Sequence, residues 1–315
     1  MHSLSNPTAD AAPDGPAWVA KQIHIGLKPP ASPLLNVRFY GRHDPSAAQP
    51  VPLVVHFHAG AFVAGSLEEG SCVARLLAAT GAIVMSLDYP LAPANPFPQA
   101  IEAGYAALVW AFKARQKLAG KDAPVFVAGE EAGGNLAAAV ALMARDRHEP
   151  QLAGQILLSP MLDPSMATQS LRCADAGAVG CTWADGWHQY LARVDHAAHP
   201  YAAPGTALRL GSLPPTLLLT AQDDPLRDEA IAYADRLRVF GRLVHAAVLP
   251  GPTGWPASYL EPADQAHAKA AWAAVVQGQF GDFFHACSRD NQTAAQDKYV
   301  HLPAFFTSSQ PISTV

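Results

Sequence analysis

The sequence is poor in charged residues and has no excess of basic ones. Charged residues make up 15% of the 315 positions, and the formal net charge is −5. Proteins that bind nucleic acid or anionic membranes do so largely through clustered lysine and arginine. We therefore expect neither kind of partner.

Cysteine is also scarce. The four cysteines, Cys72, Cys173, Cys181 and Cys287, are scattered without a C-x-x-C pair. This spacing does not favour a disulfide framework or a zinc site, and it is typical of reduced thiols in a cytoplasmic protein. We expect no bound metal and no cofactor.

Long apolar runs are missing as well. No run approaches the roughly 20 residues that a membrane-spanning helix needs. The polar stretch 1–12 lacks the apolar centre of a secretory signal. We therefore expect a soluble, cytoplasmic protein without a membrane span.

Short runs rich in valine, leucine and phenylalanine alternate with longer runs rich in alanine and leucine. The short runs, at 34–40, 51–58, 82–89, 123–129, 152–159, 216–222 and 243–249, predict strands. The longer runs, at 69–80, 98–118, 132–147, 227–240 and 262–286, predict helices. Strands that alternate with crossover helices indicate an α/β fold, with a mostly parallel central sheet and helices on both faces.

The pattern divides the chain into an N-terminal arm over 1–20, one domain over 21–286 and a polar tail over 287–315. Within the domain, 163–212 shows no strand pattern and carries several aromatic residues, which predicts a helical cap or lid. Trp187 and Tyr190 lie three positions apart and share a helix face. We expect most of this segment to pack on the main domain and the tail to be poorly ordered.

Four segments follow expected strands at their carboxyl ends, the edge at which open α/β sheets bind ligands. They read HAGAFVAGS at 58–66, DYPLAPANPFP at 88–98, GEEAGGNL at 129–136 and DDPLRDE at 223–229. In this order they closely resemble the motifs of the hormone-sensitive-lipase family of carboxylesterases. The resemblance covers most of the chain and implies the α/β-hydrolase fold.

The resemblance also implies where an esterase's catalytic triad would lie. In the G-x-S-x-G motif a serine nucleophile sits on a tight strand-to-helix turn, and this chain has Glu131 there. Asp224 matches the acid that orients the catalytic imidazole. Gly254 and Trp255 match the Gly-Phe pair that follows the histidine, which puts Thr253 at the histidine position.

The family's oxyanion hole is made of backbone amides, here those of Gly60, Ala61 and Ala132. His58 is expected to make a structural hydrogen bond that fixes this loop. We further expect the Glu131 side chain to fold back and place its carboxylate in the hole. The helix N-terminus and the amide donors would then stabilise its ionised form.

These substitutions predict a carboxylesterase-like homologue that is catalytically inactive toward ordinary esters, since no Ser-His pair remains to run acyl transfer. The partner expected is a small-molecule ligand or substrate, as in the plant gibberellin receptors, which resemble this family and have lost the triad histidine. The side chains expected to contact it are His58, Phe62, Trp187 and Trp255.

Several alternatives stay open. A homologue without any retained pocket function fits the sequence almost as well. An active hydrolase in which Glu131 attacks esters, epoxides or carbon halides would need a histidine from the lid, namely His188, His196 or His199. A metal site built from Glu131, Asp224 and a lid histidine is a further alternative. Members of this family often pair through the last strand and helix, so a homodimer is also an expectation.

Overall fold

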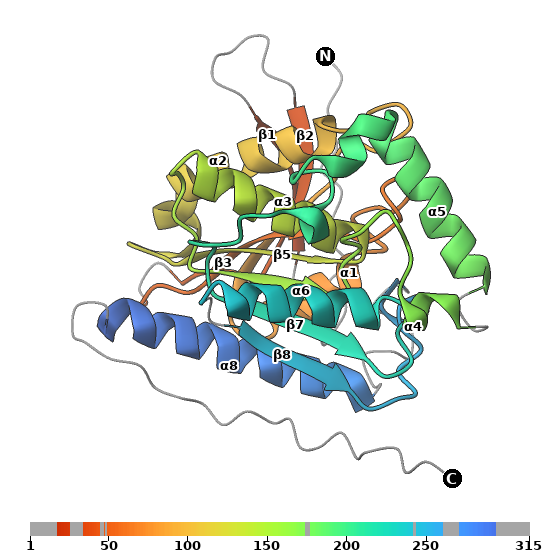
Figure 1. Cartoon of the computed structure of the whole chain (residues 1–315). Helices are drawn as coiled ribbons and strands as arrows, with labels where there is room; N and C mark the ends of the chain where they lie inside the picture. Colours follow the sequence, from red (N-terminus) through yellow and green to blue (C-terminus); the bar gives the residue numbers. More distant parts are fainter. Residues whose placement is uncertain are drawn as a thin grey trace.

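The computed structural model describes residues 18–25, 34–44, 47, 49–173, 177–241, 244–260 and 271–293. At its centre is an eight-stranded sheet with the order β1-β2-β4-β3-β5-β6-β7-β8 (Figure 1). The strands are β1 (Trp18–His24), β2 (Leu34–Tyr40), β3 (Leu53–Phe57), β4 (Ile83–Leu87), β5 (Val125–Glu130), β6 (Gly154–Leu158), β7 (Thr216–Ala221) and β8 (Val244–Leu249).

The sheet is mostly parallel, as the alternating sequence pattern predicts. β2 pairs antiparallel with both β1 and β4, and each remaining pair, from β4 to β8, is parallel. Strands β3 to β7 are buried along their whole length. Strands covered on both faces need apolar side chains on both, which explains why these segments are nearly unbroken apolar runs.

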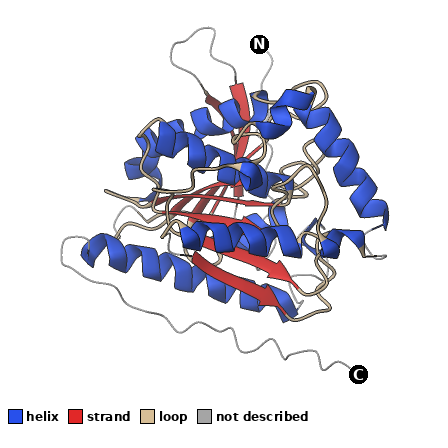
Figure 2. Cartoon of the chain, viewed as in Figure 1, coloured by secondary structure: helices blue, strands red, loops and turns tan. Residues whose placement is uncertain are grey.

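Helices cover the two faces of the sheet and define two hydrophobic cores (Figure 2). The main helices are α1 (Ser71–Ala78), α2 (Gln99–Ala119), α3 (Ala132–Asp146), α6 (Arg227–Val239) and α8 (Ala271–Thr293). Helices α1 and α8 contribute to one core, and α2, α3 and α6 contribute to the other. This two-sided cover confirms the predicted layers.

The segment 163–212 folds as a series of short helices. It contains α4 (Gln169–Arg172), α5 (Gly177–Leu191) and two 3₁₀ helices, Val194–Ala198 and Pro204–Thr206. Figure 1 shows α5 in green, extending along the end of the molecule where the central strands finish. We call α5 the lid helix.

Two expected boundaries are wrong. Strand β1 begins at Trp18, so positions 18–20 belong to the sheet rather than to an N-terminal arm. Helix α8 continues to Thr293, so positions 287–293 are helical rather than part of a tail. A short helix, α7 (Ala257–Leu260), ends just before 261–270, which lie outside the described residues, as do 1–17 and 294–315.

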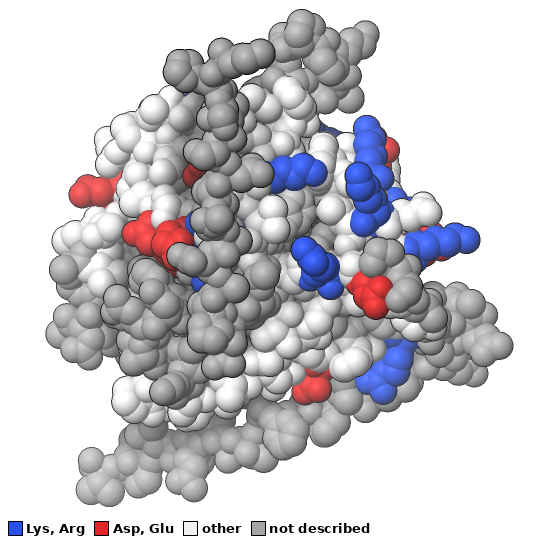
Figure 3. Space-filling model, turned by 180° about the vertical axis from the view of Figure 1, so that it is seen from behind, with Lys and Arg blue, Asp and Glu red and all other residues white. Residues whose placement is uncertain are grey.

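The face seen in Figure 3 carries both basic and acidic side chains on a largely uncharged surface, so neither sign of charge dominates it. Among the described helices, none combines the length and the apolar character that crossing a membrane requires.

Candidate active site

The strand-to-helix turn between β5 and α3 has an unusual backbone at Glu131. This residue has φ 54° and ψ −117°, a conformation that non-glycine residues rarely adopt. Its amide bonds to the Leu158 carbonyl at 3.0 Å, and its carbonyl accepts from the Met161 amide at 3.0 Å. These bonds to the end of β6 hold residue 131 at the tip of the turn.

Glycines make the tight turn sterically feasible. A Cβ on Gly129 would lie 2.2 Å from the Gly133 carbonyl oxygen, and one on Gly133 would lie 2.1 Å from the Phe57 carbonyl oxygen. No side chain fits at these distances, so the approach of α3 to β3 and β5 depends on both glycines. The turn therefore keeps the shape of a nucleophile elbow.

The carboxylate of Glu131 is held by two segments that are distant in sequence. One oxygen, Oε2, accepts a hydrogen bond from the Gly60 amide at 2.7 Å. The other, Oε1, accepts from the indole N–H of Trp183 on the lid helix. The bond to Gly60 confirms that the side chain folds back onto this loop, whereas a bond to the Ala132 amide is not among those that the carboxylate makes.

Burial dominates the electrostatics of Glu131, whose residue is only 4% exposed. Desolvation raises the pKa of Glu131 above its ordinary value, against the opposing effect of hydrogen bonds from Trp183, Gly60 and Ala61. The ionised form is therefore less favoured than in water. The hydrogen-bond donors act in the expected direction, since they favour the ionised form, but burial outweighs them.

The loop after β3 presents its amides to Glu131 through strained backbone. Gly60 has φ 132°, and the next two residues, Ala61 and Phe62, have φ 49° and 67°. Ala61 thus adopts a left-handed conformation that glycine adopts more readily. The loop therefore makes its tight turn although residue 61 carries a side chain.

His58 is a buried structural residue of this loop. Its Nδ1 bonds to the Ala59 carbonyl at 2.7 Å, its ring stacks on Tyr89 at 4.3 Å, and its Nε2 has no partner. Since a carbonyl only accepts, Nδ1 carries the proton. Burial lowers the pKa of His58, so the imidazole is neutral.

A second buried network lies behind the elbow. His56 joins Ser86 Oγ through Nδ1 at 2.9 Å and Glu130 Oε2 through Nε2 at 2.8 Å. Glu130 Oε1 also accepts from the Ala59 amide at 3.3 Å. The two adjacent glutamates thus point to different partners, and Glu130 ties the loop to the elbow from inside the core.

The acid position and the histidine position do not contact each other. Asp224 accepts hydrogen bonds from the hydroxyls of Ser159 and Thr220 and from the Leu226 amide at 2.9 Å. Thr253 instead bonds to Asp223, through its amide at 2.7 Å and its hydroxyl at 2.9 Å. Burial raises the pKa of Asp224, despite these three donors.

Residues 54–253 match the family described as alpha/beta hydrolase fold. This range contains all of the site residues described above, from His56 to Thr253. The chain belongs to the α/β-hydrolase fold family. Its relatives within that family are carboxylesterase-like.

Esterase LipI of Mycobacterium tuberculosis is 34% identical over 225 residues, which span 70% of this chain and 69% of the relative. The gibberellin receptor GID1 of Oryza sativa is 35% identical over 215 residues, 64% of this chain and 60% of the receptor. A solved structure of a bacterial heroin esterase superposes with a TM-score of 0.73 at 30% identity, covering 89% of this chain and 86% of that one.

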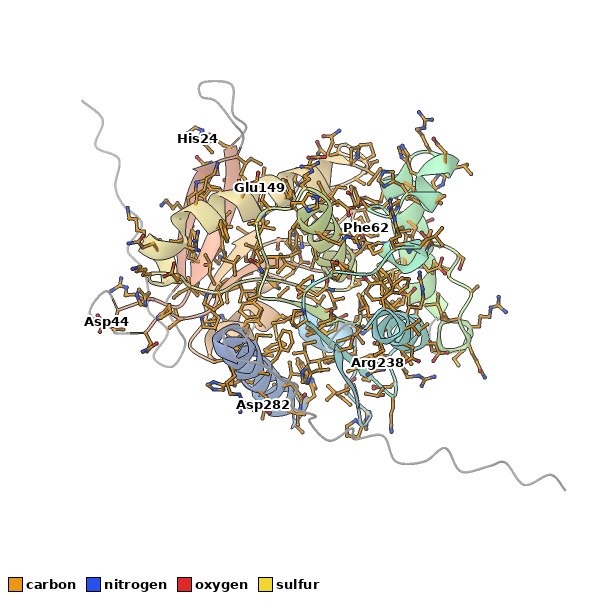
Figure 4. The ribbon with its side chains drawn as sticks, turned by 60° about the vertical axis from the view of Figure 1, so that its left-hand side comes forward. His24, Asp44, Phe62, Glu149, Arg238 and Asp282 are labelled. Carbon is orange, nitrogen blue, oxygen red and sulfur yellow. The ribbon has the colours of Figure 1, made fainter. Side chains whose placement is uncertain are left out.

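In this α/β-hydrolase, aromatic residues join the lid helix to the loop after β3. The Phe62 ring stacks on Tyr190 at 4.0 Å and lies 4.9 Å from the Trp187 ring. Figure 4 shows Phe62 next to the lid helix. Phe62, Trp187 and Tyr190 are each less than 5% exposed, so the structure is closed above Glu131.

Trp255, the fourth expected contact residue, lies in the other core. Its ring packs edge-on against Tyr259 at 5.4 Å and Trp272 at 5.6 Å. The structure therefore does not bring Trp255 together with Phe62 and Trp187. A role for any of these side chains in binding stays a prediction.

The lid histidines are not among the hydrogen-bond partners of the Glu131 side chain, which are Gly60, Ala61 and Trp183. His196 and His199 pack against Phe97, with ring separations of 5.0 and 5.1 Å, and His188 is exposed. Among the described residues, no group of three or more histidine, cysteine, aspartate or glutamate side chains is placed to hold a metal ion. The alternatives that need a lid histidine beside Glu131 thus lack support from this arrangement.

Two contributors to the site cannot be singled out from the sequence. Trp183 is one of several aromatic residues in the lid segment, and Ser159 is simply the end of an expected strand. For Ser159, the one available signal was its position at the carboxyl end of a central strand.

Proposed function

We propose that this α/β-hydrolase does not hydrolyse ordinary carboxylic esters. The observation that carries the proposal is the Glu131 carboxylate on the Gly60 amide. Ester hydrolysis needs such an amide free to bind the oxyanion of the tetrahedral intermediate. A tethered carboxylate satisfies that donor permanently and adds a buried acidic group where negative charge must develop.

The absence of an activated nucleophile supports the same proposal. A glutamate is a much weaker nucleophile toward an ester than a serine activated by a general base. Both Glu131 oxygens already accept hydrogen bonds, and Asp224 is bonded to hydroxyls rather than to an imidazole. Loss of a triad residue typically lowers the rate by several orders of magnitude.

Hydrolysis of p-nitrophenyl acetate and butyrate tests the proposal. The wild type, Glu131→Ala and a buffer blank are compared at equal protein concentration, with an active serine esterase as the positive control. We expect both proteins to match the blank. Turnover by the wild type above the blank would overturn the proposal, and its loss in Glu131→Ala would assign the activity to Glu131.

We further propose that the aromatic layer between the lid helix and the loop after β3 serves to bind a small molecule. The stacked rings of Phe62 and Tyr190, with Trp187 beside them, form an apolar surface next to the elbow. The relative from Oryza sativa is named as a receptor, so binding without hydrolysis has a precedent in this fold.

Thermal unfolding with a panel of small aromatic acids and esters tests this binding function, since a ligand of the folded state raises the midpoint. Phe62→Ala is the variant expected to lose a stabilisation seen in the wild type. A stabilisation that is equal in both proteins would place the binding elsewhere.

A further inference from the structure

Tyr259 is a buried tyrosine that the family resemblance assigns to no role. It lies on α7, is 0% exposed, and packs its ring edge-on against Trp255 at 5.4 Å. Its buried hydroxyl makes no strong hydrogen bond, and the Ser159 side chain lies within weak hydrogen-bonding reach of it. Tyrosine hydroxyls usually find a partner when buried, so this one needs an explanation.

The loop that carries Tyr259 is anchored on Asp223. The Thr253 amide and hydroxyl bond to the carboxylate of Asp223 at 2.7 and 2.9 Å, and the Gly254 amide bonds to it at 2.9 Å. The Ser258 hydroxyl in turn bonds to the Thr253 carbonyl at 2.8 Å. These bonds commit the Thr253 side chain to Asp223 and hold the following residues, up to Ser258, in one turn next to it.

The surroundings of the Tyr259 hydroxyl are those of a catalytic imidazole. The charged groups with which it interacts are Glu131, Asp224 and Glu130, and its other polar neighbour is Ser159. In a Ser-His-Asp triad, the imidazole must reach both the nucleophile and the acid. Thr253 faces Asp223, whereas the Tyr259 hydroxyl approaches the Ser159 side chain. The Ser159 hydroxyl donates to Asp224 at 2.5 Å, and the preceding residue, Leu158, accepts from the Glu131 amide at 3.0 Å.

We propose that Tyr259, rather than Thr253, occupies the space in which an imidazole would join residue 131 to Asp224. Thr253, which the resemblance places at the histidine position, would then not be the residue whose side chain fills the space of the imidazole. The phenol cannot take over as a base near neutral pH, because burial and the nearby carboxylates raise the pKa of Tyr259 well above its ordinary value. This inference rests on the proposed function, because it names the side chain that stands where an active esterase would hold its general base.

The test restores a nucleophile and then supplies an imidazole at each of the two positions. Glu131→Ser is combined with Tyr259→His in one double variant and with Thr253→His in another. Glu131→Ser with Tyr259→Phe is the matched control, because phenylalanine fills the same space without a titrating group. Hydrolysis of p-nitrophenyl acetate and labelling by a fluorophosphonate are measured for all of them beside Glu131→Ser alone.

We expect Glu131→Ser/Tyr259→His to exceed Glu131→Ser by about tenfold or more, since a positioned general base contributes 10²–10⁴-fold in a finished active site. Its rate should rise with pH through about 6–7, the range in which an imidazole loses its proton. A merely structural role for Tyr259 would not introduce this titration. Neither the phenylalanine control nor the Thr253→His variant should show it.

The proposal is overturned if Thr253→His restores the activity and Tyr259→His does not. It is also overturned if the histidine and phenylalanine variants at 259 are both folded, by circular dichroism, and equally inactive. Should the histidine variant fail to fold, Glu131→Ser/Tyr259→Ala with added imidazole replaces it. Saturable acceleration beyond that of Glu131→Ser in the same imidazole supports the proposal, and its absence overturns it.

These outcomes are separate from those of the proposed function. Activity of the wild type toward esters decides the proposed function on its own. The comparison among Glu131→Ser backgrounds decides the place of Tyr259, whatever the wild type does.

Discussion

The indole N–H of Trp183, on the lid helix, donates a hydrogen bond to the carboxylate of Glu131, at the tip of the elbow. The two residues are 52 positions apart. Trp183 is 1% exposed and Glu131 is 4% exposed, so solvent cannot replace the bond. A single polar contact thus joins the lid to the strained turn beneath it.

Trp183→Phe should lower the free energy of unfolding, because it removes one donor from a buried carboxylate while keeping an aromatic ring. The expected loss is about 1–3 kcal/mol, the usual cost of leaving a buried polar group unsatisfied. Urea unfolding followed by circular dichroism measures it.

Trp187→Phe is the matched control for that variant. Trp187 is 4% exposed and packs against Phe62. Its replacement by phenylalanine removes as much buried ring area as Trp183→Phe does, but no hydrogen bond to Glu131. Equal destabilisation of the two variants would show that the bond to Glu131 contributes nothing beyond packing.

His58→Phe should reduce the loss of stability on acidification. Burial lowers the pKa of His58 below its ordinary value of 6.5, so the unfolded chain binds a proton that the folded protein resists. Its contribution is fully present above pH 6.5 and is lost as the pH falls from there toward the folded pKa. Phenylalanine keeps the stacking on Tyr89 and does not titrate.

Thermal unfolding between pH 5 and 7.5 checks this expectation. The midpoint of the wild type should fall more steeply with acid than that of His58→Phe. Because the other twelve histidines are common to both proteins, the difference in slope isolates His58. Parallel curves would contradict the assignment of a neutral, buried imidazole.

Asp223→Ala should loosen the loop after β8. Its carboxylate accepts three hydrogen bonds from Thr253 and Gly254, which fix residues 253–254. Hydrogen exchange should therefore become faster at the amides of Thr253 and Gly254, with little change in β5 or α3. Asp228→Ala, which removes a carboxylate that bonds to Ser170 instead, should leave these amides protected.

Gly133→Ala and Gly278→Ala should have opposite effects on stability. In α3, a Cβ on Gly133 would lie 2.1 Å from the Phe57 carbonyl oxygen, so backbone must shift and the elbow must open. In α8, a Cβ on Gly278 would meet nothing within 4 Å. The first variant should be destabilised by more than about 2 kcal/mol, and the second stabilised by about 0.5–1 kcal/mol through helix propensity.

Calorimetry of the two glycine variants measures both effects. A mild result for Gly133→Ala would mean that the turn tolerates a side chain and that its tight geometry is not enforced by α3.

The fold could be predicted from the sequence because its signals are local. Apolar runs such as 125–130 and 216–221 fix buried parallel strands, and glycines at 129 and 133 fix the turn between β5 and α3. Strand β1 was missed because Trp18–His24 is exposed at most of its positions and lacks a buried-strand pattern.

The site could be predicted only in part. The fold-back of Glu131 onto Gly60 could be predicted, because the family resemblance implies an oxyanion-hole amide at Gly60 and a glutamate side chain is long enough to reach it. The bond from Trp183 could not, because it depends on how the lid packs in space. The net rise in the pKa of Glu131 could not be predicted for the same reason, since the sequence does not show how fully the lid excludes water.

Closure by the lid helix also sets a limit on kinetics. The Trp183, Trp187 and Tyr190 side chains above Glu131 are all buried, so a small molecule reaches the elbow only after α5 has moved. At low concentration its observed binding rate would rise with concentration. At high concentration the rate would level off at the opening rate of the helix, on the microsecond-to-second scale of lid motions. That plateau would be the same for every ligand, whatever its affinity.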